Sequence, residues 1–321
     1  MEVHALRTRI FFATDIHGSE TCFLKFLNSA GFYKADVLIM GGDITGKMII
    51  PEVQRSDGAY EANFLGVDHV LRSERDLLGL ERRIGLVGFY PYRTTRREFE
   101  NLQNEEGKLD ELFSRLMVGR LERWMRTAEE RLRGAAVRVY VTGGNDDRFV
   151  IDPVLKSSSR IIDPEGAVTE VDGSHEMISC AWTNPTPWKT PRECGEEELS
   201  RRLSDMISKV RDVGCCIFNT HAPPVDSGLD TCQKLDENLR PVFVGGQPAM
   251  FGAGSLAVRR MIEKHQPLLG LHGHIHESRG ASRVGRTLCL NPGSEYSEGI
   301  LRGVIVDLEE RKVRSHLFTS G

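Results

Sequence analysis

The stretch "LLGLHGHIH" (Leu268–His276) joins a short apolar run to three histidines at alternate positions. Such a run, directly after a proline, is typical of a buried β-strand. Alternate residues of an extended chain point to the same side, so the three imidazoles would lie together where the strand ends. Packing gives no reason for three histidines there. Metal binding does, because imidazole is a common metal ligand.

Four other apolar runs end in residues that can bind a metal. Helical patterns lie between the runs, and this alternation is typical of an α/β fold with a mainly parallel central sheet. The carboxyl ends of parallel strands meet at one edge of a sheet, where α/β proteins bind their ligands. The four junctions are "RIFFATDIH" (Arg9–His17), "DVLIMGGD" (Asp36–Asp43), "VRVYVTGGND" (Val137–Asp146) and "CCIFNTH" (Cys215–His221).

The five strand ends supply two carboxylates, one amide oxygen and four imidazoles. Mixed oxygen and nitrogen ligands favour Mn, Fe, Zn, Co or Ni over Ca and Mg, and the lack of thiolates excludes a typical structural zinc site. So many ligands suit two ions ~3.5–4 Å apart that share a carboxylate. The positive charge left over would favour an anionic substrate attacked by a metal-bound hydroxide. The candidate ligands are Asp15, His17, Asp43, Asn145, His221, His274 and His276.

The order of these junctions resembles that of the calcineurin-like metallophosphoesterase superfamily, whose motifs are D-x-H, G-D, G-N-H-[DE], a lone His and G-H-x-H. The resemblance covers nearly all of a single domain, 1–321, and implies a sandwich of two β-sheets flanked by helices. It also implies two metal ions bridged by Asp43. The first ion would take Asp15, His17, Asp43 and His276, and the second Asp43, Asn145, His221 and His274.

One residue departs from the family pattern. The residue after the motif Asn is usually a His that contacts the substrate phosphate and can protonate the leaving group, but here it is Asp146. A carboxylate donates a proton at pH 7 only if burial or a like charge raises its pKa. Asp146 could be that acid, His272 or Asp147 could replace it, or the leaving group could need no acid. His272 could equally be a buried residue that only supports the site.

Two segments could shape a substrate pocket. The region from about 46 to 133 is long for a connection between two strands and contains helical patterns, so we expect a helical insertion that caps the site or mediates assembly. The segment "CAWTNPTPWKTPRE" (Cys180–Glu193) carries Trp182 and Trp188. Either tryptophan could stack on a base of the substrate, or the segment could simply pack over the sheet.

The stretch "GGDITGKM" (Gly41–Met48) almost matches the phosphate-binding P-loop pattern G-x-x-x-x-G-K-[ST]. Met48 stands where the pattern needs a hydroxyl for Mg²⁺. Asp43 in the middle of the loop would also repel a phosphate. We therefore interpret this stretch as part of the metal site and not as a P-loop.

Composition narrows the remaining questions. The chain has 321 residues, 40% of them hydrophobic, enough for a large core, and its net charge of −4 makes a nucleic-acid partner unlikely. Its seven cysteines form no C-x-x-C pair, which indicates a reducing compartment. No apolar stretch approaches the ~18 residues of a membrane span. We expect a cytoplasmic protein without a membrane partner, and the sequence does not indicate its oligomeric state.

Together these features predict a dinuclear-metal-dependent phosphoesterase that acts on a small phosphoester. A diester such as a cyclic nucleotide is slightly favoured over a monoester, because of Asp146 and the tryptophan segment. A nuclease and a protein phosphatase are alternatives within the same superfamily; the first needs a basic groove and the second an open, shallow cleft. A catalytically weak, metal-binding interaction scaffold is the alternative of another class.

Overall fold

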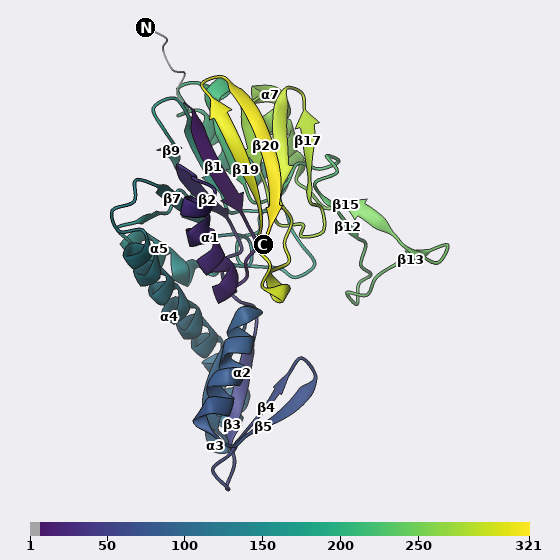
Figure 1. Cartoon of the computed structure of the whole chain (residues 1–321). Helices are drawn as coiled ribbons and strands as arrows, with labels where there is room; N and C mark the ends of the chain where they lie inside the picture. Colours follow the sequence, from purple (N-terminus) through teal and green to yellow (C-terminus); the bar gives the residue numbers. More distant parts are fainter. Residues whose placement is uncertain (1–6) are drawn as a thin grey trace.

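The computed structural model describes residues 7–321, which form two six-stranded sheets and their covering helices (Figure 1). The first sheet has the order β20-β19-β1-β2-β7-β8. Strands β1, β2, β7 and β8 run parallel, and the β19–β20 hairpin joins β1 antiparallel. The bounds are β1 Thr8–Ala13, β2 Val37–Gly41, β7 Arg138–Thr142, β8 Ile161–Ile162, β19 Arg302–Glu309 and β20 Lys312–Ser320.

The second sheet has the order β17-β18-β16-β11-β10-β9. Its four central strands are parallel, and β9 and β17 pair antiparallel at the two edges. Its strands are β9 Val168–Glu170, β10 Glu176–Cys180, β11 Ile217–Thr220, β16 Leu269–Leu271, β17 Gly280–Val284 and β18 Thr287–Asn291. One mainly parallel sheet, as strand–helix alternation alone suggested, is therefore wrong: the parallel strands divide between two mixed sheets.

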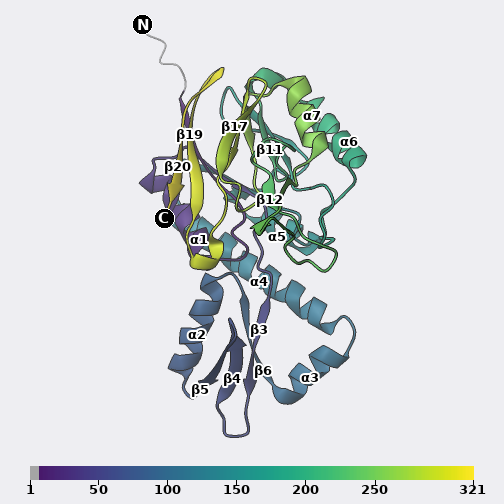
Figure 2. The ribbon, with the colours of Figure 1, turned by 90° about the vertical axis from the view of Figure 1, so that its right-hand side faces the viewer.

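The two sheets face each other across an apolar core that includes Phe12, Ile39, Ile217 and Leu269. Helices cover both outer faces, with α6 and α7 on the second sheet and α1, α4 and α5 on the first (Figure 2). This arrangement confirms the predicted sandwich of two sheets flanked by helices. The helices are α1 Glu20–Phe32, α4 Lys108–Arg131, α5 Asp152–Ser157, α6 Glu196–Ile207 and α7 Leu256–His265.

The segment between β2 and β7 forms a lobe of its own below the sandwich (Figure 2). It contains the expected helices and also a four-stranded sheet, in the order β5-β4-β3-β6, that we did not expect. Its strands have mixed polarity because one face packs on α2 and the other is largely exposed. Besides α4, it consists of β3 Ile49–Gln54, β4 Tyr60–Phe64, β5 Val67–Leu71, α2 Glu74–Leu86, β6 Tyr90–Thr95 and α3 Arg96–Asn104.

Arg120 of α4 fixes this lobe to the sandwich. Its buried guanidinium donates hydrogen bonds to the carbonyls of Gly18 (2.8 Å), Gly88 (3.0 Å) and Phe89 (2.6 Å). It also lies over the Tyr90 ring, at 4.1 Å from the centroid. Gly18 directly follows His17, so the lobe is anchored to a loop that carries a candidate metal ligand.

Glu52 on β3 is a buried carboxyl, and among the described residues its two oxygens have no hydrogen-bond partner. Burial and the nearby Glu81 raise its pKa from 4.5 to about 7, against the opposing charge of Arg93. The folded protein therefore holds this proton more tightly than the unfolded chain. By linkage, the stability that the proton provides is complete below about pH 4.5 and is lost as the pH rises through 7.

We expect Glu52→Gln to make the free energy of unfolding less dependent on pH. The variant should match the wild type at pH 5 and be more stable by about 1–2 kcal/mol at pH 8. Urea unfolding at the two pH values measures this difference, with the exposed Glu197→Gln on α6 as the control. Equal loss of stability by wild type and Glu52→Gln between pH 5 and 8 would contradict it.

A β-ribbon leaves the sandwich between β11 and α7 (Figure 1). Strand β12 pairs with β15, and β13 pairs with β14, both antiparallel. The bounds are β12 Thr231–Gln233, β13 Phe243–Val244, β14 Gln247–Pro248 and β15 Met250–Gly252. Within residues 7–321, no helix has the length and hydropathy needed to cross a membrane.

Candidate metal centre

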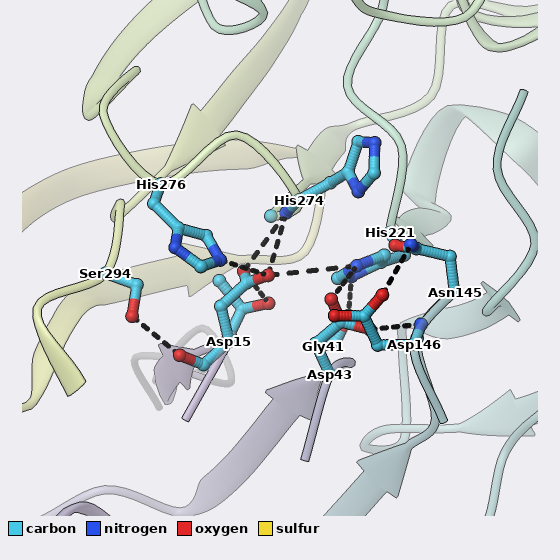
Figure 3. Close-up of polar contacts among 12 residues, drawn as sticks. Asp15, Gly41, Asp43, Asn145, Asp146, His221, His274, His276 and Ser294 are labelled. Atoms are coloured by element: carbon cyan, nitrogen blue, oxygen red, sulfur yellow. Dashed lines mark hydrogen bonds and ion pairs between the residues drawn. The ribbon is translucent and has the colours of Figure 1, made fainter. Parts of the chain in front are cut away.

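Five strand ends, from both sheets, meet at one place (Figure 3). In the first sheet, Asp15 and His17 follow β1, Asp43 follows β2 and Asn145 follows β7. In the second sheet, His221 follows β11, and His274 and His276 follow β16. The loops after β1 and β2 are joined by hydrogen bonds from Asp15 N to Gly42 O and from His17 N to Asp43 O, both 2.9 Å. All seven predicted ligands therefore lie in one region.

The backbone at this centre is strained. Asp15, His17, Asp43 and His274 have positive φ angles of 55°, 39°, 49° and 68°. Residues other than glycine pay about 1–2 kcal/mol in this region, and such strain clusters at functional sites. The surrounding hydrogen bonds hold these four side chains in positions that an ordinary turn would not give.

Two glycines of the motifs let the loops approach the carboxylates. A Cβ at Gly144 would collide with the Asp43 side chain and backbone, and a Cβ at Gly273 would collide with Asp15 and Thr14. The motif glycines are therefore needed for close packing around the two carboxylates.

Three clusters of side chains could hold a metal ion: two contain only predicted ligands, and the third joins His17 and Asp43 to Asp146. In the first, Asp15, His17 and His276 come within 4.8 Å of one another. The Nε2 atoms of His17 and His276 lie 3.0 Å apart, and Asp15 Oδ1 lies 3.4 Å from His276 Nε2. In the second group, Asp43, His221 and His274 meet the same limit.

Asp43 lies between the two groups. Its Oδ2 atom is 3.8 Å from His17 Nε2 and 3.4 Å from His221 Nε2, while its Oδ1 accepts a hydrogen bond from Asp146 N at 2.9 Å. A carboxylate that faces histidines of both groups has the position that a bridging ligand requires.

The free polar atoms fit divalent metal ions. His221 Nδ1 donates to the Gly41 carbonyl at 3.0 Å, so Nε2 is the atom left to bind a metal, and this buried atom has no hydrogen-bond partner within residues 7–321. A backbone carbonyl is the usual second partner of a metal-bound imidazole. Asn145 Nδ2 donates to Thr190 Oγ1 at 2.9 Å, and the buried Oδ1 has no partner in the part of the chain that the structure describes. Unsatisfied acceptors of this kind are costly unless a cation binds them.

The electrostatics point the same way. Burial alone would lower the pKa of His221, but the charges of Asp43 and Asp15 outweigh it and raise that pKa to about 10. Without a cation, this region is negative enough to hold a proton on a fully buried imidazole. A bound divalent cation would replace that proton.

Comparison with known proteins supports the fold. No protein-family model matches the chain. MJ1162 of Methanocaldococcus jannaschii is 29% identical over 154 residues, which span 47% of this chain and 62% of that protein. One solved structure aligns with a TM-score of 0.57 and 15% identity, over 96% of this chain and 98% of its own. TT1561 of Thermus thermophilus aligns with a TM-score of 0.51 and 13% identity, over 98% of this chain and 99% of its own.

The two sheets pack as the motif resemblance implies, and the motif residues form two ligand groups on either side of Asp43. The chain has a two-sheet sandwich fold, and its ordered motifs resemble those of the calcineurin-like metallophosphoesterases.

Asp146 occupies the position where calcineurin-like proteins usually have a histidine, and it forms an ion pair that the sequence did not reveal. Its Oδ2 is 2.7 Å from Lys47 Nζ. Burial and the Asp43 charge raise the pKa of Asp146 to about 6, with Lys47 opposing them. At pH 7 Asp146 is therefore mainly ionised and paired with the ammonium group.

Asp147 does not face the candidate metal centre as a free acid. Its carboxylate accepts hydrogen bonds from Ile44 N (3.0 Å), Thr45 N (2.9 Å), Thr45 Oγ1 (2.6 Å) and Gly144 N (2.8 Å). It ties the loop after β2, which carries Asp43, to the loop after β7, which carries Asn145. These bonds hold two loops that carry candidate ligands in a fixed relative position.

His272 also points away from the two ligand groups. Its Nδ1 lies 3.1 Å from the Thr220 carbonyl and 3.0 Å from Thr220 Oγ1, and its Nε2 lies against Gly270. Burial lowers its pKa to about 4, so the ring is neutral. Within residues 7–321 no hydrogen bond or ion pair joins its ring to the seven candidate ligands, and its contacts with Thr220 link the end of β16 to β11.

A cavity of about 1140 Å³ opens from the candidate metal centre. Its far walls come from α4, from residues 184–191 and from the β12–β15 ribbon, which contribute Phe113, Trp188 and Phe251. Trp188 is 61% exposed on this cavity. Trp182 does not line it and packs instead against Arg202, whose guanidinium lies 4.0 Å from the indole centroid.

Proposed function

We propose that this chain is a dinuclear-metal-dependent phosphoesterase that hydrolyses a small phosphoester. The observation that carries the proposal is the position of Asp43 Oδ2, which faces His17 of one ligand group and His221 of the other. When bound, two divalent ions supply Lewis-acid polarisation of a phosphoryl group and a lowered pKa for water.

The protein groups support this chemistry in separate ways. Asp15, His17, Asp43 and His276 would hold one ion, and Asp43, Asn145, His221 and His274 the other. Thr190 orients the Asn145 amide, the Gly41 carbonyl orients His221, and Asp147 fixes the two loops. Manganese is one of several metals that this donor set suits.

The cavity supports a substrate larger than inorganic phosphate. Its volume of about 1140 Å³ slightly exceeds the ~300–1,000 Å³ of ordinary ligand pockets. Phe113, Trp188 and Phe251 offer aromatic surface away from the ligand groups. A diester with an aromatic or heterocyclic substituent, such as a nucleotide, would use both regions. Walls on several sides of the cavity favour a small molecule over a folded protein substrate.

We expect Trp188→Ala to raise the KM for an aromatic diester by about 3- to 10-fold, with little change in kcat. Loss of one stacking contact has about this effect. The measurement is the steady-state hydrolysis of bis-p-nitrophenyl phosphate. Phe243→Ala is a matched control, because Phe243 is also 61% exposed but lies on the outer ribbon. An unchanged KM in Trp188→Ala would show that this tryptophan does not contact the substrate.

Hydrolysis after metal exchange tests the proposed function. The protein is stripped of metal, restored with Mn, Fe, Zn, Co or Ni, and assayed on bis-p-nitrophenyl phosphate and p-nitrophenyl phosphate. The proposal predicts turnover that depends on the restored metal and is faster on the diester. No hydrolysis of either ester with two ions bound per chain would favour a metal-binding scaffold instead.

A further inference from the structure

Lys47 lies at the border between the ligand groups and the cavity. Its side chain is 43% exposed, and both Lys47 and Asp146 line the cavity beside Asp43 and His276. Its position in the chain, four residues after Asp43, puts it in the loop that β2 delivers to the centre.

The partner of Lys47 is held firmly. Asp146 N donates to Asp43 Oδ1 at 2.9 Å, and Asp146 Oδ1 accepts a hydrogen bond from Asn145 Nδ2 at 3.2 Å. The other carboxylate oxygen, Oδ2, faces Lys47 Nζ at 2.7 Å and His17 Nδ1 at 3.8 Å. Asp146 therefore fixes the ammonium group against the edge of both candidate metal sites.

The ion pair between Lys47 and Asp146 changes the charge that a substrate would meet at this place. An ionised Asp146 alone would repel a phosphoryl oxygen at this place, and Lys47 cancels that repulsion. An ammonium group has three N–H donors, and Asp146 Oδ2 takes one of them. Within residues 7–321 the ammonium group has no other ion pair or hydrogen bond, so two donors are left for a ligand in the cavity that Lys47 lines.

Two other basic residues, Arg148 and Lys189, line the cavity, but neither is placed like Lys47. Arg148 is engaged by the Asp110 carboxylate at 2.6 Å and by Ser114 Oγ at 2.9 Å. Lys189 belongs to the exposed segment that carries Trp188. Among the described cavity-lining residues, Lys47 alone combines a positive charge with an ion pair to the loop that carries Asn145.

We propose that Lys47, oriented by Asp146, binds the phosphoryl group of the substrate and so replaces the histidine that calcineurin-like proteins usually have at position 146. This inference rests on the proposed function and identifies the group that recognises the substrate phosphate. A partly exposed ion pair contributes only ~0–1 kcal/mol to stability, so stability alone is a weak reason for the pair. Lys47 is a substrate-binding residue in this account, and Asp146 positions it.

Binding of inorganic phosphate to the Mn²⁺-loaded protein tests the proposal without turnover. Calorimetry should show that Lys47→Met weakens phosphate binding by about 10- to 100-fold, with the Mn²⁺ content unchanged. Lys47→Arg should restore most of the affinity, and Lys189→Met should bind phosphate like the wild type. Asp146→Asn should weaken binding less than Lys47→Met, and the double variant should bind no worse than Lys47→Met.

The variant Asp146→His makes the test sharper. If Lys47 replaces the usual histidine, Asp146→His combined with Lys47→Met should recover phosphate affinity that Lys47→Met alone loses. A purely structural ion pair would not give this rescue.

Three results would overturn the proposal. They are unchanged phosphate affinity in Lys47→Met, loss of Mn²⁺ from that variant, and no phosphate binding by the loaded wild type. Lys47-dependent phosphate binding without hydrolysis of either nitrophenyl ester would refute the proposed function and leave this inference standing. The two failures are therefore distinguishable.

Discussion

Asp43→Asn is expected to reduce metal-dependent hydrolysis by at least ~1000-fold, a loss of about 4 kcal/mol in transition-state stabilisation. The substitution removes one of the two carboxylates among the seven candidate ligands. Asp43 Oδ2 faces His17 and His221, and an amide at this place cannot act as an anionic bridge. We also expect the variant to hold fewer than two Mn²⁺ ions per chain.

Turnover of bis-p-nitrophenyl phosphate and metal content measured on the same sample check this prediction. Asp205→Asn, at an exposed position on α6, is the matched control and should behave like the wild type. Asp43→Asn with two bound ions and near-normal turnover would refute the bridging role.

Asp147→Ala should be the most destabilising substitution near the centre. It leaves four donors in a buried region without their acceptor. Each unsatisfied buried group costs about 1–3 kcal/mol, and relaxation and water entry reduce the sum. We expect a loss of about 3–5 kcal/mol and a fall in Tm of roughly 4–7 °C.

We also expect Asp147→Ala to bind Mn²⁺ less tightly, because the loops that carry Asp43 and Asn145 are no longer held together. Thermal unfolding and Mn²⁺ binding at a temperature where the variant is folded check the two effects separately. The exposed Asp205→Ala serves as the control. A stable Asp147→Ala protein that binds two ions would show that other contacts hold these loops in place.

The candidate ligands could be predicted because each follows a buried strand, and strand ends of α/β folds converge. Short apolar runs that end in Asp, Asn or His are local features of the sequence. The division of the strands between two sheets was implied only by the family resemblance. Pairing such as β11 with β16 joins residues far apart in the chain and leaves no local signal.

The insertion shows a similar limit. Strands β3, β4 and β5 have one exposed face and include a proline and several charged residues, so their apolar runs are too short to recognise. Helices α2 and α4 are longer, and their apolar residues recur at helical spacing, which is a pattern that a sequence shows.

Side-chain roles were the least predictable level. Lys47 belongs to a stretch that resembles a P-loop, and only the structure brings its ammonium group to Asp146. His272 alternates with two candidate ligands, yet its ring turns to Thr220. Trp182 and Trp188 occupy one segment, but only Trp188 lines the cavity. Spacing along a strand or loop does not determine which way each ring turns.

Titration of Mn²⁺ into the metal-free protein, while hydrolysis of bis-p-nitrophenyl phosphate is followed, tests the central claim most directly. The claim is that two ions bridged by Asp43 act together. The account predicts little turnover after the first equivalent, a steep rise with the second, and a plateau at two ions per chain. Full activity at one ion per chain, or no activity with two ions bound, would contradict it.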